Sequence, residues 1–336
     1  MVRRIFSLLV LSLILFNVFG CGSSVDELID TIDDPDRKPI DQSRTGVNNF
    51  FVDSEFGSID TQYRDIRNTL GLRFVRVLLA WTNEVQPSPS ADPNFGFFDA
   101  ILDSIPPDTD VLVTVVHSPD WMANSSNWIN GNPRATWVER WLRPVVTRYS
   151  GRSGISAWEV WNEPDLTVVA ADSALGLEDP NNYFELLSLG AQVVRSLDPG
   201  KLVVGAATRS IQQNFPSALD YNRSLRDLGA ADLVDVWNVH YYGKQFDRVV
   251  QNNGVADFLN GLGKVIWITE SGEQGPNNQL DYVERAWPFL KEKIPGIDRF
   301  YYYQYGSTAP LEQNFGLRTN DPTFPVSDLY IHLRDG

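Results

Sequence analysis

Short apolar runs alternate with longer amphipathic stretches along most of the chain. The runs are rich in Val, Ile and aromatic residues, and the longer stretches repeat their apolar residues at helical spacing. This alternation is typical of βα units built around a parallel sheet. We expect strands at Thr45–Phe51, Arg73–Leu79, Asp110–Val116, Ser156–Asn162, Lys201–Ala206, Leu233–His240, Lys264–Glu270 and Arg299–Tyr303, and helices at Thr61–Leu70, Thr136–Ser150, Asn181–Leu197 and Leu280–Lys293.

The expected strands are almost continuously apolar, which indicates burial on both faces. Eight such strands favour a closed barrel over an open doubly wound sheet. No Gly-x-Gly-x-x-Gly sequence follows the first strand, so the dinucleotide-binding fingerprint of the rival architecture is missing. No linker, repeat or shift of composition divides residues 43–336. The sequence therefore predicts a single α/β domain, a (β/α)8 TIM barrel, over this range.

The N-terminal residues read as an export signal. Arg3 and Arg4 precede an apolar run that is short for a membrane span and ends at Gly20-Cys21, which predicts a signal peptide over residues 1–21. The cleavage region resembles the lipobox of bacterial lipoproteins, and this resemblance implies that Cys21 carries a lipid. The alternative is an ordinary signal peptide followed by a lone thiol. Residues 22–42 are polar and acidic, and we expect a disordered tether between a lipid-anchored or secreted N-terminus at the cell envelope and the barrel.

Composition narrows the class of partner. A net charge of -15 and the lack of a basic run argue against nucleic acid and against an anionic surface, so a neutral substrate fits better. The three histidines, His117, His240 and His332, are far apart in the sequence, and no His-Glu-x-x-His motif or cysteine cluster is present. We therefore expect no metal and no cofactor, no contact with a membrane except through the anchor, and a monomeric chain.

Two glutamates stand where two apolar strands end, which is the active-site edge of such barrels. Glu163 closes the string Trp158-Glu159-Val160-Trp161-Asn162-Glu163, and Glu270 closes Trp267-Ile268-Thr269-Glu270. A carboxylate directly after buried apolar residues is costly to desolvate unless it has a function. Two of them on one face of a barrel can act on a single bond from opposite sides.

The motif Trp161-Asn162-Glu163-Pro164 resembles the Asn-Glu-Pro motif of the clan A glycoside hydrolases. In these enzymes the acid/base ends strand four and the nucleophile ends strand seven, and both positions match. The longer string from Trp158 to Asp165, with Ser118-Pro119-Asp120-Trp121, is most similar to family 39, the xylosidases and iduronidases, with families 5 and 51 next. The resemblance implies a retaining hydrolase that works by double displacement, with Glu163 as acid/base and Glu270 as nucleophile.

The resemblance also implies roles for residues around the two glutamates. Arg76 is similar to an arginine beside the nucleophile, although it could instead be an interior counter-ion to Glu159. Asn162 would bind the sugar 2-hydroxyl, His240 and Tyr242 would lie beside the nucleophile, and His117 and Trp121 would line the pocket for the sugar. Strand eight ends with Tyr302-Tyr303-Gln304-Tyr305 where clan members usually have a tryptophan, so Tyr305 or Gln304 is expected in its place.

The sequence leaves three activities open. The first is hydrolysis of a β-linked neutral polysaccharide or oligosaccharide at the cell envelope. The second is glycan binding by a barrel that has lost activity, suggested by the changed aromatic residue of strand eight, although the intact pair Glu163 and Glu270 argues against it. The third is transglycosylation, in which an acceptor sugar replaces water.

Overall fold

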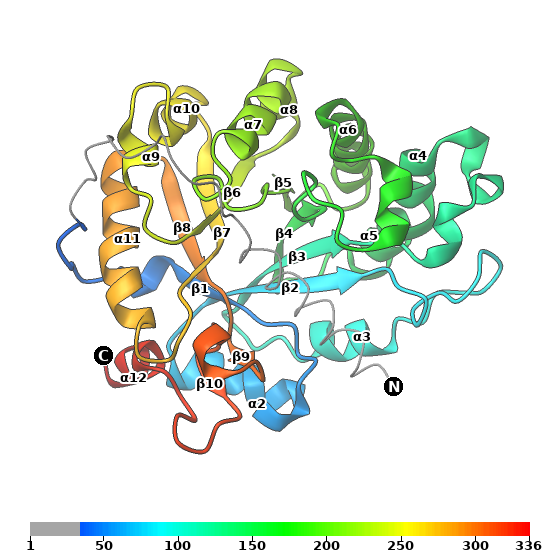
Figure 1. Cartoon of the computed structure of the whole chain (residues 1–336). Coiled ribbons are helices and arrows are strands. Elements are labelled where there is room, and N and C mark those ends of the chain that lie inside the picture. Colours follow the sequence, from blue (N-terminus) through cyan, green and yellow to red (C-terminus); the bar gives the residue numbers. More distant parts are fainter. Residues whose placement is uncertain (1–33) are drawn as a thin grey trace.

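The computed structural model describes residues 34–336. The expected signal peptide with Cys21, and residues 22–33 of the expected tether, lie outside this range, so export and lipidation stay predictions. Eight parallel strands close into a barrel in the order β1 to β8, each bonded to its neighbours and β8 to β1 (Figure 1). The predicted (β/α)8 barrel is confirmed. The strands are β1 Thr45–Asn48, β2 Phe74–Ala80, β3 Asp110–Val116, β4 Ile155–Val160, β5 Leu202–Gly205, β6 Val236–Tyr242, β7 Val265–Gly272 and β8 Ile297–Tyr302.

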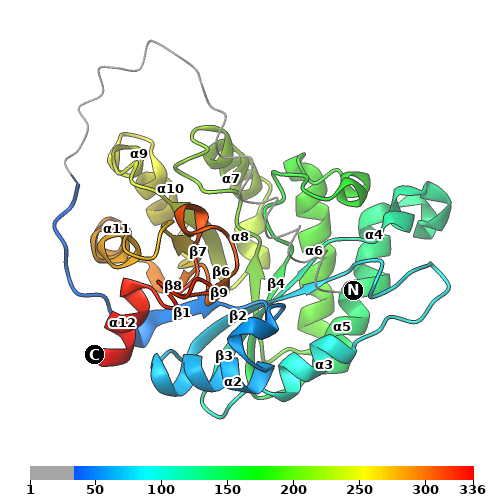
Figure 2. The same ribbon diagram turned by 60° about the horizontal axis from the view of Figure 1, so that its bottom comes forward.

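Helices surround the barrel on its outside (Figure 2). The four predicted helices are present, and several others were not predicted. Within residues 34–336, no helix is long and apolar enough to cross a membrane. The α-helices are α2 Ile59–Arg64, α3 Gly96–Asp103, α4 Pro133–Trp137, α5 Arg143–Tyr149, α6 Pro180–Leu197, α7 Ser217–Asp227, α8 Ala230–Leu233, α9 Asp247–Val250, α10 Val255–Gly261, α11 Gln279–Lys293 and α12 Asp328–Asp335, and a two-stranded sheet pairs β9 Gly306–Ser307 with β10 Arg318–Thr319.

Most element boundaries follow local signals in the sequence. The Asp179 side chain accepts a hydrogen bond from the Asn181 N–H and so caps α6, with Pro180 as its first residue. Asn132 caps α4 in the same way, so that this helix begins at Pro133, three residues before its predicted start. The predicted strand from Leu233 was wrong at its beginning, because Leu233 ends helix α8 and β6 starts only at Val236.

The barrel interior has an apolar layer beneath a polar one. The apolar layer is a separate cluster of buried side chains with one member from each of seven strands. Two residues further along five of these strands, the buried side chains become polar or charged. Because side chains alternate between the two faces of a strand, positions two apart point into the same interior. The apolar layer is Phe74, Leu112, Ala157, Val204, Val236, Trp267 and Tyr301, and the polar layer is Arg76, Thr114, Glu159, Asn238 and Thr269.

The polar layer is held together by hydrogen bonds across the barrel. Glu159 accepts bonds from Arg76, Thr114 and Asn238, so both of its carboxylate oxygens are satisfied. The Thr269 hydroxyl donates to the Asn238 side-chain oxygen at 2.6 Å. A buried charge is tolerated when it is paired and hydrogen-bonded, so this layer is a stable floor for whatever lies above it.

The last part of the predicted tether is ordered against the barrel. Residues 34–41 run beside α11 (Figure 2), where the Lys38 N–H donates to the Glu284 carbonyl at 2.9 Å and Arg37 pairs with the Glu284 carboxylate. Arg285 also donates to the Pro35 carbonyl at 2.7 Å. These contacts tie residues 35–38 of the predicted tether to α11, and the tether as a whole stays a prediction. Composition alone missed this because the segment is held by charges on a helix far along the chain.

Candidate active site

Glu163 reaches the open end of the barrel through an irregular turn. Strand β4 ends at Val160, and Trp161 and Glu163 both have left-handed backbone angles, with φ of 79° and 45°. Such angles are uncommon for residues other than glycine and persist where the surroundings enforce them. Here the Trp161 N–H donates to Val115 and the Glu163 N–H donates to Ala207, each at 2.9 Å. The turn aims the Glu163 side chain over the polar layer.

Glu270 reaches the same place by a register shift. Along β7, Trp267 and Thr269 point inward, so regular alternation would send Glu270 outward. The pairing of β7 with β6 shifts between Val239 and His240, and its pairing with β8 shifts between Ile268 and Ser271. A bulge of this kind rotates the side chains that follow it. Glu270 consequently joins Thr269 in facing the interior.

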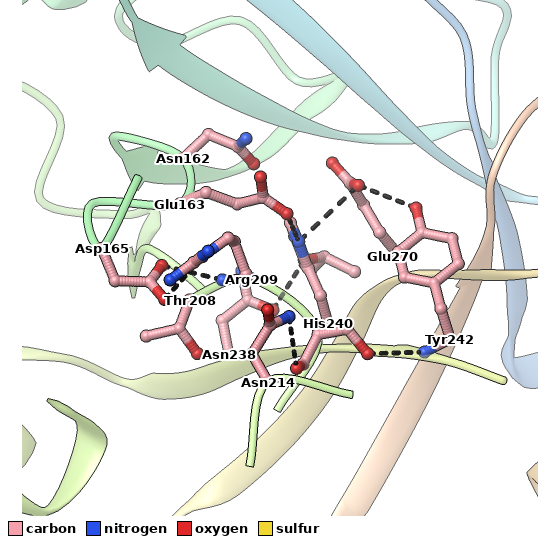
Figure 3. A network of polar contacts seen from close by, with 12 residues as sticks. Asn162, Glu163, Asp165, Thr208, Arg209, Asn214, Asn238, His240, Tyr242 and Glu270 are labelled. Carbon is pink, nitrogen blue, oxygen red and sulfur yellow. Dashed lines mark hydrogen bonds and ion pairs between the residues drawn. The ribbon is translucent and has the colours of Figure 1, made fainter. Parts of the chain in front are cut away.

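The two glutamates and His240 form a compact group at the carboxyl ends of β4, β6 and β7 (Figure 3). His240 Nδ1 lies 3.0 Å from Glu163 Oε1 and 3.6 Å from Glu270 Oε2. One oxygen of each carboxylate and one ring nitrogen of His240 all lie within 4.8 Å of one another. Glu163 and Glu270 are only 6% and 5% exposed. Repulsion between the two carboxylates is therefore little screened by water, and their environments decide which one carries the charge.

Arg76 links the polar layer to this group. Its guanidinium donates to Glu159 at 2.7 Å, to Glu270 Oε1 at 2.6 Å, to Asn48 at 2.9 Å and to Asn162 at 2.7 Å. The two alternatives for Arg76 are therefore both realised, since it pairs with Glu159 and with Glu270. The Asn162 side-chain oxygen is engaged, while its amide nitrogen makes no bond within residues 34–336.

The surroundings split the acidities of the two glutamates. Burial raises the pKa of Glu163, and its hydrogen bond to His240 only partly opposes this effect. Burial alone would also raise the pKa of Glu270, but the charges of His240 and Arg76, with bonds from Arg76 and Tyr242, hold this pKa below its usual range. Burial lowers the pKa of His240, and the two carboxylates outweigh that and raise it. One carboxyl that keeps its proton beside one that stays ionised is a pairing suited to acid/base and nucleophilic work.

Aromatic side chains form one wall beside Glu270. The Tyr242 hydroxyl donates to Glu270 Oε2 at 2.9 Å, and its ring packs edge-on against Tyr303 at 6.0 Å and Phe315 at 5.6 Å. Tyr303 is buried and close enough for the charges of Glu270 and Glu163 to raise its pKa together with burial. Tyr303, the first residue after β8, thus lies near the two glutamates, and it was not among the residues expected there.

Tyr305 does not join this group. It is fully buried, and its hydroxyl donates to Asp65 at 2.8 Å, in a cluster with Tyr330 and Arg318 away from the two glutamates. Within residues 34–336 no contact joins Tyr305 to the two glutamates, and its predicted place at the floor of the sugar site stays a prediction. Strand β8 ends at Tyr302, so the alternation that would make positions 303 and 305 equivalent no longer applies beyond it. Gln304, the other expectation, is buried beside Tyr303.

His117 and Trp121 follow β3 and lie further from the pair. His117 Nδ1 is 2.7 Å from Asp172, which also accepts from Ser118 at 2.7 Å, so these bonds fix the turn Ala170–Leu175 to the end of β3. The Trp121 ring meets Trp81 edge-on at 5.1 Å, with Arg140 over its face at 5.6 Å. No contact links either residue to the glutamates within residues 34–336, although His117 packs against Trp161 at 6.2 Å.

The glutamates and His240 also have the donor set of a metal site, because each offers one ligand atom. The chemistry of the group argues against a resident cation. The Arg76 guanidinium already pairs with Glu270, and His240 Nδ1 is already hydrogen-bonded to Glu163, so a cation would face a fixed positive charge and would have to break that hydrogen bond.

Comparisons with known proteins agree with this fold. No family model and no curated protein matches the chain. Among solved structures, it resembles a family 39 glycoside hydrolase from Bacteroides cellulosilyticus (TM-score 0.61, 18% identity, 89% of this chain and 64% of that chain). A monomeric β-xylosidase from Caulobacter crescentus gives a TM-score of 0.61 at 18% identity over 89% and 69% of the two chains. An endo-1,4-β-mannanase from Rhizomucor miehei gives 0.57 at 15% identity over 90% and 98%.

These similarities show the fold, which this chain shares with glycoside hydrolases of family 39 and other clan A members. The chain spans just under two thirds of the first of these structures and nearly all of the mannanase. The resemblance that the two glutamate motifs indicated in the sequence is thus matched by the barrel on which they lie.

Proposed function

We propose that the protein is a retaining glycoside hydrolase that cleaves β-glycosidic bonds, with Glu163 as acid/base and Glu270 as nucleophile. The observation that carries the proposal is the pair of buried carboxylates with one oxygen of each inside a group 4.8 Å across. Carboxyls about 5–5.5 Å apart leave no room for a water between acid and sugar, whereas inverting enzymes keep them about 6.5–9.5 Å apart. The close spacing therefore favours direct attack by one carboxylate.

The proposed reaction has two displacements. Glu163 gives its proton to the leaving-group oxygen while Glu270 attacks the anomeric carbon, so the glycosidic bond breaks as a glycosyl ester forms. In the second step Glu163 removes a proton from water, and the water oxygen displaces Glu270 with a second inversion and net retention. His240 holds the Glu163 carboxyl by a hydrogen bond, so the protonation of the two side chains is linked. Arg76 and Tyr242 keep Glu270 ionised between turnovers.

The names of the enzymes that share the fold support a proposal for the substrate class. The matching structures are named as β-xylosidases, β-galactosidases, a mannanase and an exo-β-mannosidase. We propose a β-linked oligosaccharide or polysaccharide of xylose, galactose or mannose units. We expect the Asn162 amide, which the Arg76 bond orients, to bind the sugar 2-hydroxyl, a contact that strengthens in the transition state.

The test is the anomeric configuration of the first product, followed by proton NMR on β-xylo-, β-galacto- and β-manno-oligosaccharides. The protein with residues 34–336 intact is compared with its Glu270→Gln variant. We expect a β-product in the wild type and a loss of about 10⁴-fold or more in kcat/KM in the variant. Glu273→Gln is the matched control, because Glu273 follows the same strand and its side chain accepts, within residues 34–336, only the neighbouring Gln274 N–H, so activity should persist.

The same spectra separate the competing functions. Initial α-product would refute the role of Glu270 as nucleophile. Glycan binding without any product, unchanged in Glu270→Gln, would instead identify a binding protein that has lost activity. Longer oligosaccharides that accumulate with retained configuration would identify transglycosylation, since an acceptor sugar then replaces water in the second step.

A further inference from the structure

Arg209 lies on the chain segment that is tied directly to Glu163. The Glu163 N–H donates to the Ala207 carbonyl at 2.9 Å, and the Arg209 N–H donates to Asp165 Oδ1 at 2.9 Å. These two bonds join residues 163–165, which follow β4, to residues 207–209, which follow β5. Figure 3 shows Arg209 and Asp165 together beside Glu163, with Glu270 and Tyr242 beyond it.

The Arg209 side chain is fixed at one edge and open at the other. Its Nε lies 3.2 Å from Asp165 Oδ2, and Asp165 is 7% exposed, so the inner edge of the guanidinium is anchored by a buried carboxylate. The Arg209 side chain itself is 35% exposed. Within residues 34–336 its terminal nitrogens Nη1 and Nη2 have no hydrogen-bond partner. The Arg76 guanidinium, which also borders the two glutamates, is by contrast fully buried, and each of its three nitrogens donates to a side chain.

The position of Arg209 relative to the reaction follows from the roles of the two glutamates, so this inference rests on the proposed function. The nucleophile Glu270 attacks the anomeric carbon of the sugar that stays on the enzyme. The acid Glu163 faces the oxygen of the sugar that leaves. Arg209 is bonded to the segment that carries Glu163, whereas Glu270 is surrounded by Arg76 and Tyr242 from β2 and β6. Arg209 therefore borders the leaving-group side.

We propose that Arg209 binds a carboxylate on the leaving sugar, so that the protein prefers a bond whose leaving side is a uronic acid. The planar fork of an arginine matches the two oxygens of a carboxylate, and such charge-assisted pairs are about twice as strong as neutral hydrogen bonds. Asp165 holds the fork in one orientation before binding, which lowers the entropy lost when the substrate docks.

The overall negative charge of the chain does not oppose this preference. Charges more than about 8 Å away are screened at physiological ionic strength, so the net charge of -15 says little about one subsite. We still expect a neutral sugar in the position that bonds to Glu270, but we expect an acidic sugar on the leaving side. The Asp165–Arg209 pair is locally neutral, so recognition depends on the geometry of the fork more than on long-range attraction.

The experiment compares matched disaccharides. In each pair, a β-xylosyl, β-galactosyl or β-mannosyl unit is linked to glucuronic acid or to its carboxyl-reduced counterpart, glucose. The readout is the ratio of kcat/KM for the acidic and the reduced member of a pair, with Kd from calorimetry on the Glu270→Gln variant as a second readout. We expect a ratio of about 10 or more in the wild type, from one charge-assisted pair, and a ratio near 1 in Arg209→Gln.

Two further variants serve as controls for the effect of Arg209→Gln. Arg195→Gln removes an exposed arginine that pairs with Asp235 on the outer face, and it should keep the wild-type ratio. Arg209→Lys keeps the charge but not the fork, and its ratio should fall between those of the wild type and Arg209→Gln. Thermal unfolding of each variant shows that the barrel is intact.

Every outcome decides between the two proposals. A wild-type ratio near 1, or equal losses on both disaccharides in Arg209→Gln, would overturn the uronic acid preference while hydrolysis stands. Tighter binding of the acidic disaccharides that depends on Arg209, without turnover, would sustain the subsite and overturn the hydrolase. Neither binding nor turnover of any pair would overturn both.

Discussion

Two glutamates of the same chain segment, Glu159 and Glu163, face the barrel interior but differ in how fully their carboxylates are hydrogen-bonded. Glu159, in the polar layer, accepts bonds from Arg76, Thr114 and Asn238 and has no unsatisfied oxygen. Glu163, one layer higher, has the His240 ring as its only side-chain partner in the described part of the chain, and it lies close to a second carboxylate. A saturated buried carboxylate stabilises the fold, whereas an under-supported one beside a like charge is primed to exchange a proton.

The largest expected effect tests the role of Glu163 in this comparison. Glu163→Ala should lower kcat/KM by about 10³-fold on disaccharides and by about tenfold or less on aryl glycosides with acidic leaving groups, because only the former need protonation. Steady-state rates on the two substrate classes measure the difference. Equal losses on both would contradict the assignment of Glu163 as the acid. Glu270→Gln serves as the comparison, since it should impair both classes alike.

A smaller effect is expected for Glu159 in the polar layer. Glu159→Gln should lower the free energy of unfolding by about 3 kcal/mol. The substitution leaves the buried Arg76 charge partly uncompensated, and the new amide NH2 group would face the N–H groups of Asn238 or Arg76, which are donors as well. The shift of the urea unfolding midpoint measures it. Glu163→Gln is the matched substitution one layer up, and its free energy of unfolding should stay within about 1 kcal/mol of the wild type. If both variants unfold at the same urea concentration, the two layers do not differ as described.

The smallest effect sharpens the contrast between Glu163 and Glu270. The kcat/KM profile should be bell-shaped, with an acid limb from the lowered pKa of Glu270 and a basic limb from the raised pKa of Glu163. Tyr242→Phe removes a bond to the ionised Glu270, so the pKa of Glu270 rises and the acid limb moves to higher pH, with about a tenfold lower kcat/KM. The control is Tyr241→Phe, whose buried hydroxyl has no partner within residues 34–336. An unmoved acid limb in Tyr242→Phe would remove Tyr242 from this role.

The sequence predicted the barrel because buried parallel strands are short, apolar and separated by amphipathic helices. The positions of Glu163 and Glu270 followed from where those apolar runs stop. What could not be predicted lies where alternation fails. The bulge in β7 brings both Thr269 and Glu270 inward, and the chain leaves β8 at Tyr302, so Tyr303 packs against Tyr242 beside the glutamates while the Tyr305 hydroxyl bonds Asp65. Such departures depend on pairing between strands, which leaves no local pattern.

Contacts between distant segments were the other part beyond prediction. The bond from His117 to Asp172 spans two loops, and the salt bridge from Arg37 to Glu284 spans most of the domain. In both cases the residue types are ordinary for an exposed loop. Arg209 was missed for the same reason, since only its bond to Asp165 places it beside Glu163.

The shared guanidinium of Arg76 has a consequence for cooperativity. Its partners Asn48, Glu159 and Glu270 belong to β1, β4 and β7, and Asn48 in turn donates to the backbone of Thr269 and Tyr302 on β7 and β8. These strands come from both ends of the domain, so the reactive arrangement exists only once the ring of strands has closed. Partly folded chains would lack it altogether, and loss of turnover on heating should coincide with global unfolding rather than precede it.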